Sequence, residues 1–465
     1  MNFVKRLVPF IIGIGLWMIP TPEGLSIEAW QLFSIFIGTI SGIIIRPFPM
    51  PATALIGLTA VVMTKTLTLE QALSGFSRDV IWLIVVAYFV AFGIIKTGLG
   101  NRISYFFMML LGKKTLGLTY GLAATNIIMA PAIPSSTARA GGVLLPIMES
   151  LSFNYESKPH DPSAKKIGSY LFASLFQINT IADAMFLTAM AANPLTVEIA
   201  REMGINISWG SWFLAASVPA LISLIVIPLV IYVIHPPKIK ETPHAAEFAK
   251  EHLKKMGKIK LDEMIMLGVF SLLLVLWMIG PSYGIKAAST GLLGLSILLL
   301  TKVLTWQELV KESEAWSTLV WFAVLLMMAS ALNQLGFTSW FGDLVVGPVQ
   351  FLDWRVAFLL LSLIYFYTHY LFAGNISHVG AMLPTFLMVA IKIGTPPYLA
   401  AYTLGFFSAL FGGLTHYGSG PGAVLYGAGF VNIRDWWTIG FTSSLFNVAI
   451  WLVIGGAWWK FLGIW

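Results

Sequence analysis

The segment APAIPSSTARAGGVLLP, residues 130–146, interrupts an apolar stretch with prolines, hydroxyl groups and an arginine. Pro131 and Pro134 end a helix, because proline has no amide hydrogen and its ring clashes with the preceding turn. Arg139 follows within one turn of the next helix. A helix that breaks and restarts inside apolar sequence predicts a hairpin, 117–150, whose tip lies within a membrane.

The polar residues of this tip are candidates for binding. Fixed charge in an apolar region is costly unless it is paired or hydrated. Arg139 therefore either faces a binding site or has a structural role, in which it snorkels to the membrane surface or pairs with Asp183, and we favour the first interpretation. The hydroxyl residues before it supply donors at a helix start, and the candidates are Ser135, Ser136, Thr137 and Arg139.

A second segment, YLFAGNISHVGAMLP at 370–384, has the same character and predicts a second hairpin, 352–392. A lone histidine in apolar sequence usually belongs to the core. His378, however, follows the break at nearly the position of Arg139, which favours a functional role. The candidates in this segment are Gly374, Asn375, Ile376, Ser377 and His378.

Two further segments combine small and polar residues. LTAMAANP at 187–194 resembles LTHYGSGP at 414–421, and the sequence from 415 to 429 holds five glycines and a proline. Close helix packing through small residues is one explanation. We favour unwound binding loops, since such a density of glycine is rare in a spanning helix. The candidates are Thr188, Asn193, Pro194, Thr415, His416, Ser419, Gly420 and Pro421.

These segments belong to an internal repeat. LTLEQALSGF from Leu67 resembles LTWQELVKES from Leu304, and the match continues from LLP at Pro146 to MLP at Pro384. The shift in helix number between the copies is odd, which predicts that the second copy is inverted in the membrane. Inverted repeats with broken helices are typical of secondary transporters, and freed amides at helix N-termini bind anions.

Composition places the whole chain in a membrane. Of 465 residues, 57% are hydrophobic and 11% are charged, against about 25% charged in soluble proteins. Apolar runs of membrane-spanning length predict about eleven transmembrane helices besides the two re-entrant hairpins. We expect their centres near residues 12, 38, 57, 90, 178, 222, 272, 294, 328, 404 and 450.

Lysines predict the orientation. The loop 236–260 contains seven Lys and three Glu, and basic short loops remain cytoplasmic. The N-terminus is therefore expected in the cytoplasm. Leu7 to Pro20 is interpreted as the first membrane helix rather than a cleaved signal, because no small-residue cleavage site follows. The simplest location is a bacterial inner membrane.

Other classes of protein lack support. There is no cysteine and no nucleotide-binding G-x-x-x-x-G-K-[ST] sequence, and neither H-E-x-x-H nor G-x-S-x-G occurs. No metal, cofactor or enzymatic activity is predicted, and an intramembrane enzyme is only a remote alternative. The lysines cluster in one loop rather than on an aromatic-rich face, so nucleic acid is not expected as a partner.

At its interrupted segments the chain resembles the divalent anion/sodium symporter superfamily. It is most similar to the branch of citrate/succinate and tartrate/succinate antiporters and the plastid 2-oxoglutarate/malate translocator. The matching pieces are PSSTARAGGVLLPI, DAMFLTAMAANPL, YLFAGNISHVGAMLP and LTHYGSGPGAVLYGAGF. The resemblance implies a homodimer that moves small dicarboxylates or tricarboxylates across the lipid bilayer by an elevator mechanism.

The expected division of each protomer alternates along the chain. A scaffold is expected from 1–116 and from 212–351, which includes the cytoplasmic loop 236–262. A moving transport domain is expected from 117–211, with the first hairpin, and from 352–465, with the second hairpin.

Departures from the family pattern affect the expected coupling. Sodium symporters of the family carry Ser-Asn-Thr at both tips, where this chain has Ser135-Ser136-Thr137 and Gly374-Asn375-Ile376. A dicarboxylate still requires compensating positive charge, which Arg139 and His378 could supply permanently. We therefore expect exchange of dicarboxylates or citrate without sodium. A sodium- or proton-coupled symporter remains the alternative.

Overall fold

The structure is a computed structural model that describes residues 3–346 and 352–465, and within these residues it contains helices and no β-strand. The predicted all-α class is confirmed. Each predicted span coincides with a helix, and the last continues through a π-helical turn into α23 (Gly456–Phe461). These helices are α1 (Phe3–Trp17), α2 (Ile27–Ile45), α3 (Met50–Met63), α5 (Asp79–Thr97), α9 (Gly168–Met185), α11 (Trp209–Ile234), α13 (Leu261–Ile279), α14 (Ala287–Leu300), α16 (Ser313–Gln334), α20 (Pro397–Leu410) and α22 (Ile433–Ala449).

Apolar side chains on the outside of the bundle suit a bilayer. Val233 is 77% exposed, Val453 70% and Ile14 60%. Soluble monomeric proteins rarely expose so many large apolar side chains. Among the described residues, six helices are long and apolar enough to cross a membrane.

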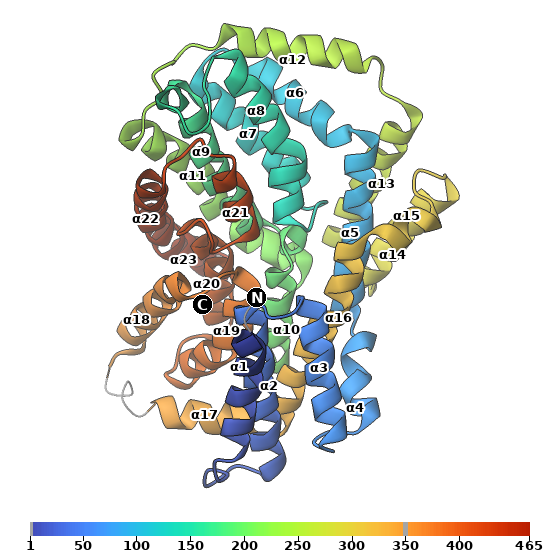
Figure 1. The fold of residues 1–465 in the computed structure, drawn as a ribbon, viewed down its shortest axis with the longest axis vertical. Coiled ribbons are helices and arrows are strands. Elements are labelled where there is room, and N and C mark those ends of the chain that lie inside the picture. The colour runs from blue at the N-terminus through green and yellow to red at the C-terminus, as the bar shows by residue number, and fades with distance from the viewer. Residues whose placement is uncertain (1–2, 347–351) are drawn as a thin grey trace.

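Two hairpins are formed at the predicted positions, and the first arm of each is too short to cross the bilayer alone. The first consists of α7 (Thr115–Met129) and a second arm that begins at Ser136, passes through a π-helical stretch (Ala138–Leu144) and continues as α8 (Leu145–Asn154). The second consists of α18 (Trp354–Tyr367) and α19 (Asn375–Lys392). The 15 residues of α7 extend about 22 Å, less than the roughly 30 Å of the hydrocarbon core. In Figure 1, α7 and α8 lie towards the end that carries α12, and α19 lies nearer the opposite end.

Two spanning helices are interrupted at the predicted segments, but the breaks are shorter than expected, since residues 192–194 and 420–427 are helical. After α9 the chain unwinds over 186–191 and resumes as α10 (Ala192–Glu202). After α20 it forms a short 3-10 turn and a loop to residue 419, and resumes as α21 (Gly420–Gly427).

The repeated LT pairs have the same local structure. Thr68 begins α4 (Leu69–Leu73) with a capping box to Gln71. Thr305 begins α15 (Trp306–Lys311) with a capping box to Glu308. In Figure 1 these short helices lie near opposite ends of the region formed by α5 and α16. Reciprocal side-chain bonds of this kind satisfy helix-start amides.

The lysine-rich loop contains a helix that the sequence did not predict. This helix is α12 (Pro243–Met256), which packs on α6 (Leu99–Leu111) and runs across one end of the molecule in Figure 1. Ala245 and Ala249 face inward, and Tyr105 stacks on His252 at 4.8 Å between ring centroids. The remaining helix, α17 (Phe337–Val346), packs against α19.

The predicted boundary between parts falls close to the start of α11. This helix was assigned to the scaffold, but it packs mainly along α9 and also contacts α22 and α7. All three of these helices belong to the segments assigned to the transport domain. The division into scaffold and transport domains itself stays a prediction.

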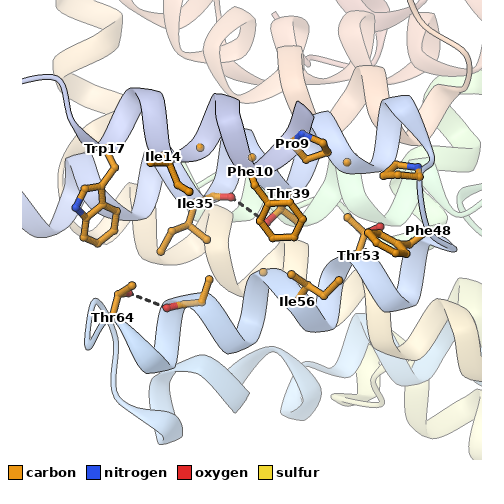
Figure 2. Close-up of a pocket in the computed structure, with 16 residues that line it drawn as sticks. Pro9, Phe10, Ile14, Trp17, Ile35, Thr39, Phe48, Thr53, Ile56 and Thr64 are labelled. Atoms are coloured by element: carbon orange, nitrogen blue, oxygen red, sulfur yellow. Dashed lines mark hydrogen bonds between the residues drawn. The ribbon is translucent and has the colours of Figure 1, made fainter. Parts of the chain in front are cut away.

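A groove of about 420 Å³ lies among α1, α2 and α3 (Figure 2). None of its lining residues is charged. A Cβ added to Gly57 would lie 2.3 Å from Thr39 Oγ1, and one on Gly42 would lie 2.6 Å from Thr53 Cγ2. These glycines therefore allow the helices to approach closely. The groove shares no lining residue with the cavity described next.

Candidate functional site

A cavity of about 600 Å³ lies where both hairpin tips and both unwound loops meet. Its volume is within the usual range for small-molecule sites. The two tips come from segments more than 200 residues apart in the chain, so the fold, not local sequence, creates the site. The predicted residues that line the cavity are Ser135, Ser136, Thr137, Gly374, Asn375, Ile376, Ser377, Ser419, Gly420 and Pro421.

Four helix N-termini converge on this cavity. The second arm of the first hairpin begins at Ser136, α10 at Ala192, α19 at Asn375 and α21 at Gly420, and all four residues line the cavity. The last three helices have no side-chain cap at their N-termini. Apart from Pro194 and Pro421, which have no amide hydrogen, their first-turn residues have amides without intrahelical partners, at the positive end of the helix dipole. Such termini bind anions.

Arg139 lies behind the cavity wall rather than on its surface. It is fully buried and forms an ion pair with Asp183. Its Nε donates to Asn126 Oδ1 at 2.6 Å, and its Nη1 donates to the carbonyls of Ile133 at 2.9 Å and Ala189 at 3.2 Å. The guanidinium thus joins the first tip to α9 and to the unwound loop after it. Of the two interpretations of this residue, the geometry matches pairing with Asp183.

Asp183 connects this buried network to the cavity, which it helps to line. Its second carboxylate oxygen accepts the Ser136 hydroxyl at 2.5 Å. The Asn179 amide donates to Ser136 Oγ at 2.6 Å. The tip hydroxyl is thereby held in one orientation by groups on α9.

His378 is also buried away from the cavity. Its ring stacks on Phe372 and on Phe411, each at 4.4 Å between centroids. Its Nδ1 lies 3.0 Å from Nδ1 of His369, whose Nε2 donates to the Gly418 carbonyl at 2.8 Å. Since a carbonyl only accepts, neutral His369 must accept at Nδ1, and His378 must donate there. The imidazole pair fastens the second tip to the second unwound loop.

The remaining predicted residues support the loops from behind the cavity lining. The Thr188 hydroxyl donates to the Pro131 carbonyl at 2.7 Å, joining the first loop to the first tip. The Asn193 amide donates to the carbonyls of Asp183 and Phe186 at the end of α9. The other members are the buried Pro194 and Thr415, and His416, whose Nδ1 accepts from Trp437 at 3.3 Å.

Some cavity residues were missed by the sequence reasoning, chiefly Arg46, Tyr88 and Glu314. They come from helices outside the interrupted segments, where no break in the apolar pattern marks them. The one signal for Arg46 is its place as a lone charge between an apolar helix and the prolines at 47 and 49.

A multi-pass helical membrane protein whose broken helices meet at a polar cavity is a transporter of small solutes. The chain belongs to the sodium:sulfate symporter transmembrane region family, whose model matches residues 1–465. Its relatives are transporters rather than enzymes.

Three relatives show the breadth of this similarity. The putative malate transporter YflS of Bacillus subtilis is 51% identical, over 100% of this chain and 97% of that protein. Spinach chloroplastic dicarboxylate transporter 1 is 49% identical, over 99% and 82%. The citrate/succinate antiporter of Escherichia coli is 34% identical, over 100% and 99%.

A solved structure agrees in fold. The YdaH transporter of Alcanivorax borkumensis matches with a TM-score of 0.54 and 13% identity, covering 98% of this chain and 96% of that one. At this identity the likeness concerns the fold alone.

Proposed function

We propose that this protein exchanges small dicarboxylates, such as 2-oxoglutarate, malate and succinate, or citrate across a membrane by an elevator movement and without sodium. The observation that carries this proposal is the convergence of four helix N-termini on one cavity. Their amides, with the hydroxyls of Ser135 and Thr137, suit carboxylate oxygens. The names of the relatives support the same substrate class.

Sodium independence is supported by the environment of Arg139. Four oxygens surround its guanidinium, two from backbone carbonyls and two from side chains. Hard cations in proteins bind oxygens of these kinds. Because a permanent cation already occupies them, a sodium ion has no role to fill there.

Exchange is supported by the cost of moving an empty cavity. Without substrate, the first-turn amides of α19, those of Gly420 and Gly422 in α21, and that of Ala192 in α10 would have to cross the membrane without anionic partners. Buried polar groups without partners are costly, so the loaded form should cross far faster. We further propose that the repeats are inverted, that the N-terminus is cytoplasmic, and that two protomers form the working unit.

The test uses purified protein in liposomes. Vesicles preloaded with succinate should take up labelled malate from a sodium-free medium, and empty vesicles should take up at least ten-fold less. Collapsing the pH gradient with an ionophore should leave the rate unchanged. Rapid uptake into empty vesicles driven by an inward sodium or proton gradient would refute the exchange mechanism and favour symport.

A further inference from the structure

Arg46 presents a guanidinium to the substrate cavity from outside the interrupted segments. It follows α2 directly and lines the cavity beside the second tip. Its Nη2 donates to the Ala373 carbonyl at 3.3 Å. Within the described part of the chain, no carboxylate lies within 4 Å of this guanidinium.

Arg46 and Arg139 differ in how many of their N–H donors form hydrogen bonds to the protein. An arginine carries five N–H donors. Arg139 uses most of them on fixed oxygens, and its charge is matched by Asp183. Arg46 makes one hydrogen bond to protein in the described residues. Its remaining donors can accept a planar, two-oxygen anion, which is the geometry that arginine recognises best.

The backbone at Arg46 is unusual for a residue with a side chain. It ends α2 in the left-handed conformation, with φ 54° and ψ 50°. Glycine is the usual residue there, because a Cβ strains this conformation. Lys65 has the same left-handed conformation outside the cavity, so it provides a matched position for comparison with Arg46.

A negatively charged side chain also lines the cavity. Glu314, in the first turn of α16, is among the lining residues. It disfavours an anion at its own position, so an anionic group that extends beyond the tips is directed towards Arg46. The helix N-termini and Arg46 thus provide separate positive regions within one cavity.

We propose that Arg46 binds the second carboxylate of the substrate and thereby selects dicarboxylates over monocarboxylates. This inference rests on the proposed function, since it assigns one end of the same substrate. The first carboxylate is held by the tip amides and hydroxyls. The second lies against the guanidinium of Arg46, next to the carbonyl of Ala373.

The experiment compares succinate with succinamate, in which an amide replaces one carboxylate at nearly constant shape. Binding of each to purified protein is measured by titration calorimetry, which does not depend on the transport mode. Arg46→Gly removes the charge and relaxes the left-handed backbone, so the fold should not suffer. Lys65→Gly is the matched control, because exposed Lys65 follows the C-cap of α3 with φ 59° and lies outside the cavity.

Wild type and Lys65→Gly should share the same preference for succinate. Arg46→Gly should weaken succinate binding about 10- to 100-fold, as loss of a charged hydrogen-bond pair does, and change succinamate binding less than three-fold. Arg46→Lys should fall between. Equal losses for both ligands, or an unchanged preference in Arg46→Gly, would overturn the role of Arg46. Failure of wild type to bind any dicarboxylate would instead refute the proposed function.

Discussion

The two hairpin tips bond their exposed backbone carbonyls with different side chains. Each tip breaks a helix within the bilayer and must satisfy the exposed backbone. At the first tip a charged pair, Arg139 with Asp183, ties carbonyls together. At the second tip a histidine pair, His369 with His378, is packed among aromatic rings and holds the Gly418 carbonyl.

The two tips should therefore respond differently to substitution. A buried ion pair is costly to half-remove, because the remaining charge has no partner. A stacked neutral ring contributes by packing and one hydrogen bond, so its loss should be graded. We therefore expect a single substitution in the Arg139–Asp183 pair to cause a large loss of stability, and a substitution of His378 to cause a smaller loss. The cavity between them depends on both.

The largest expected effect concerns the sides from which the hairpins enter. Single cysteines replacing exposed Asn154 and Arg355 should react with a membrane-impermeant maleimide from opposite faces, and all-or-none labelling is expected because the hairpins oppose each other. The chain has no cysteine of its own. Lys258→Cys, in the lysine-rich loop, serves as the cytoplasmic reference. Asn154 should label with it, since neighbouring Tyr155 accepts the Ala245 amide of α12.

Labelling of both hairpin positions from the same face would contradict the inverted arrangement of the two hairpins. The two tips would then not be related by an inverted repeat. The similar positions of Arg139 and His378 after their breaks would be coincidental.

Sequence sufficed where the signal was local. Long apolar runs predicted the spanning helices, and Pro131 and Pro134 located the first tip next to the observed end of α7. The helix α12 was missed because its loop is polar and lysine-rich, and its inward face consists of small residues such as Ala245 and Ala249.

The sequence indicated which segments of the chain line the cavity, but not which of their side chains point into it. Hydroxyl and glycine residues at the breaks line the cavity, because the break itself faces it. Where Arg139 points depends on Asp183, 44 residues later, and where His378 points depends on His369 and Phe411. Arg46 and Glu314 reach the cavity only through tertiary packing, which no local pattern reports.

The next largest effect is expected at the charged tip. Arg139→Met should abolish exchange and lower the free energy of unfolding by about 3–5 kcal/mol, because it leaves Asp183 buried and unpaired. Asp183→Asn should be similarly damaging. The double variant Arg139→Met/Asp183→Asn removes both charges and should regain most of the thermal stability, measured as the unfolding midpoint in detergent.

Succinate binding by the double variant decides what Arg139 does. If it binds succinate with normal affinity once stability returns, the arginine only positions the tip. If stability returns and succinate affinity stays more than ten-fold weaker, the guanidinium contributes to substrate binding, as the sequence first suggested.

The smallest effect is expected at the neutral tip. His378→Ala removes a ring stacked between Phe372 and Phe411, which should cost about 1–3 kcal/mol of stability for two aromatic contacts. Because His378 does not line the cavity, the KM for malate exchange should change less than two-fold while kcat falls a few-fold. His378→Phe keeps the stack and should retain more stability, yet it leaves Nδ1 of His369 without its donor. A rise in KM of ten-fold or more in His378→Ala, at unchanged stability, would show that this histidine contacts the substrate and that the two tips bind it alike.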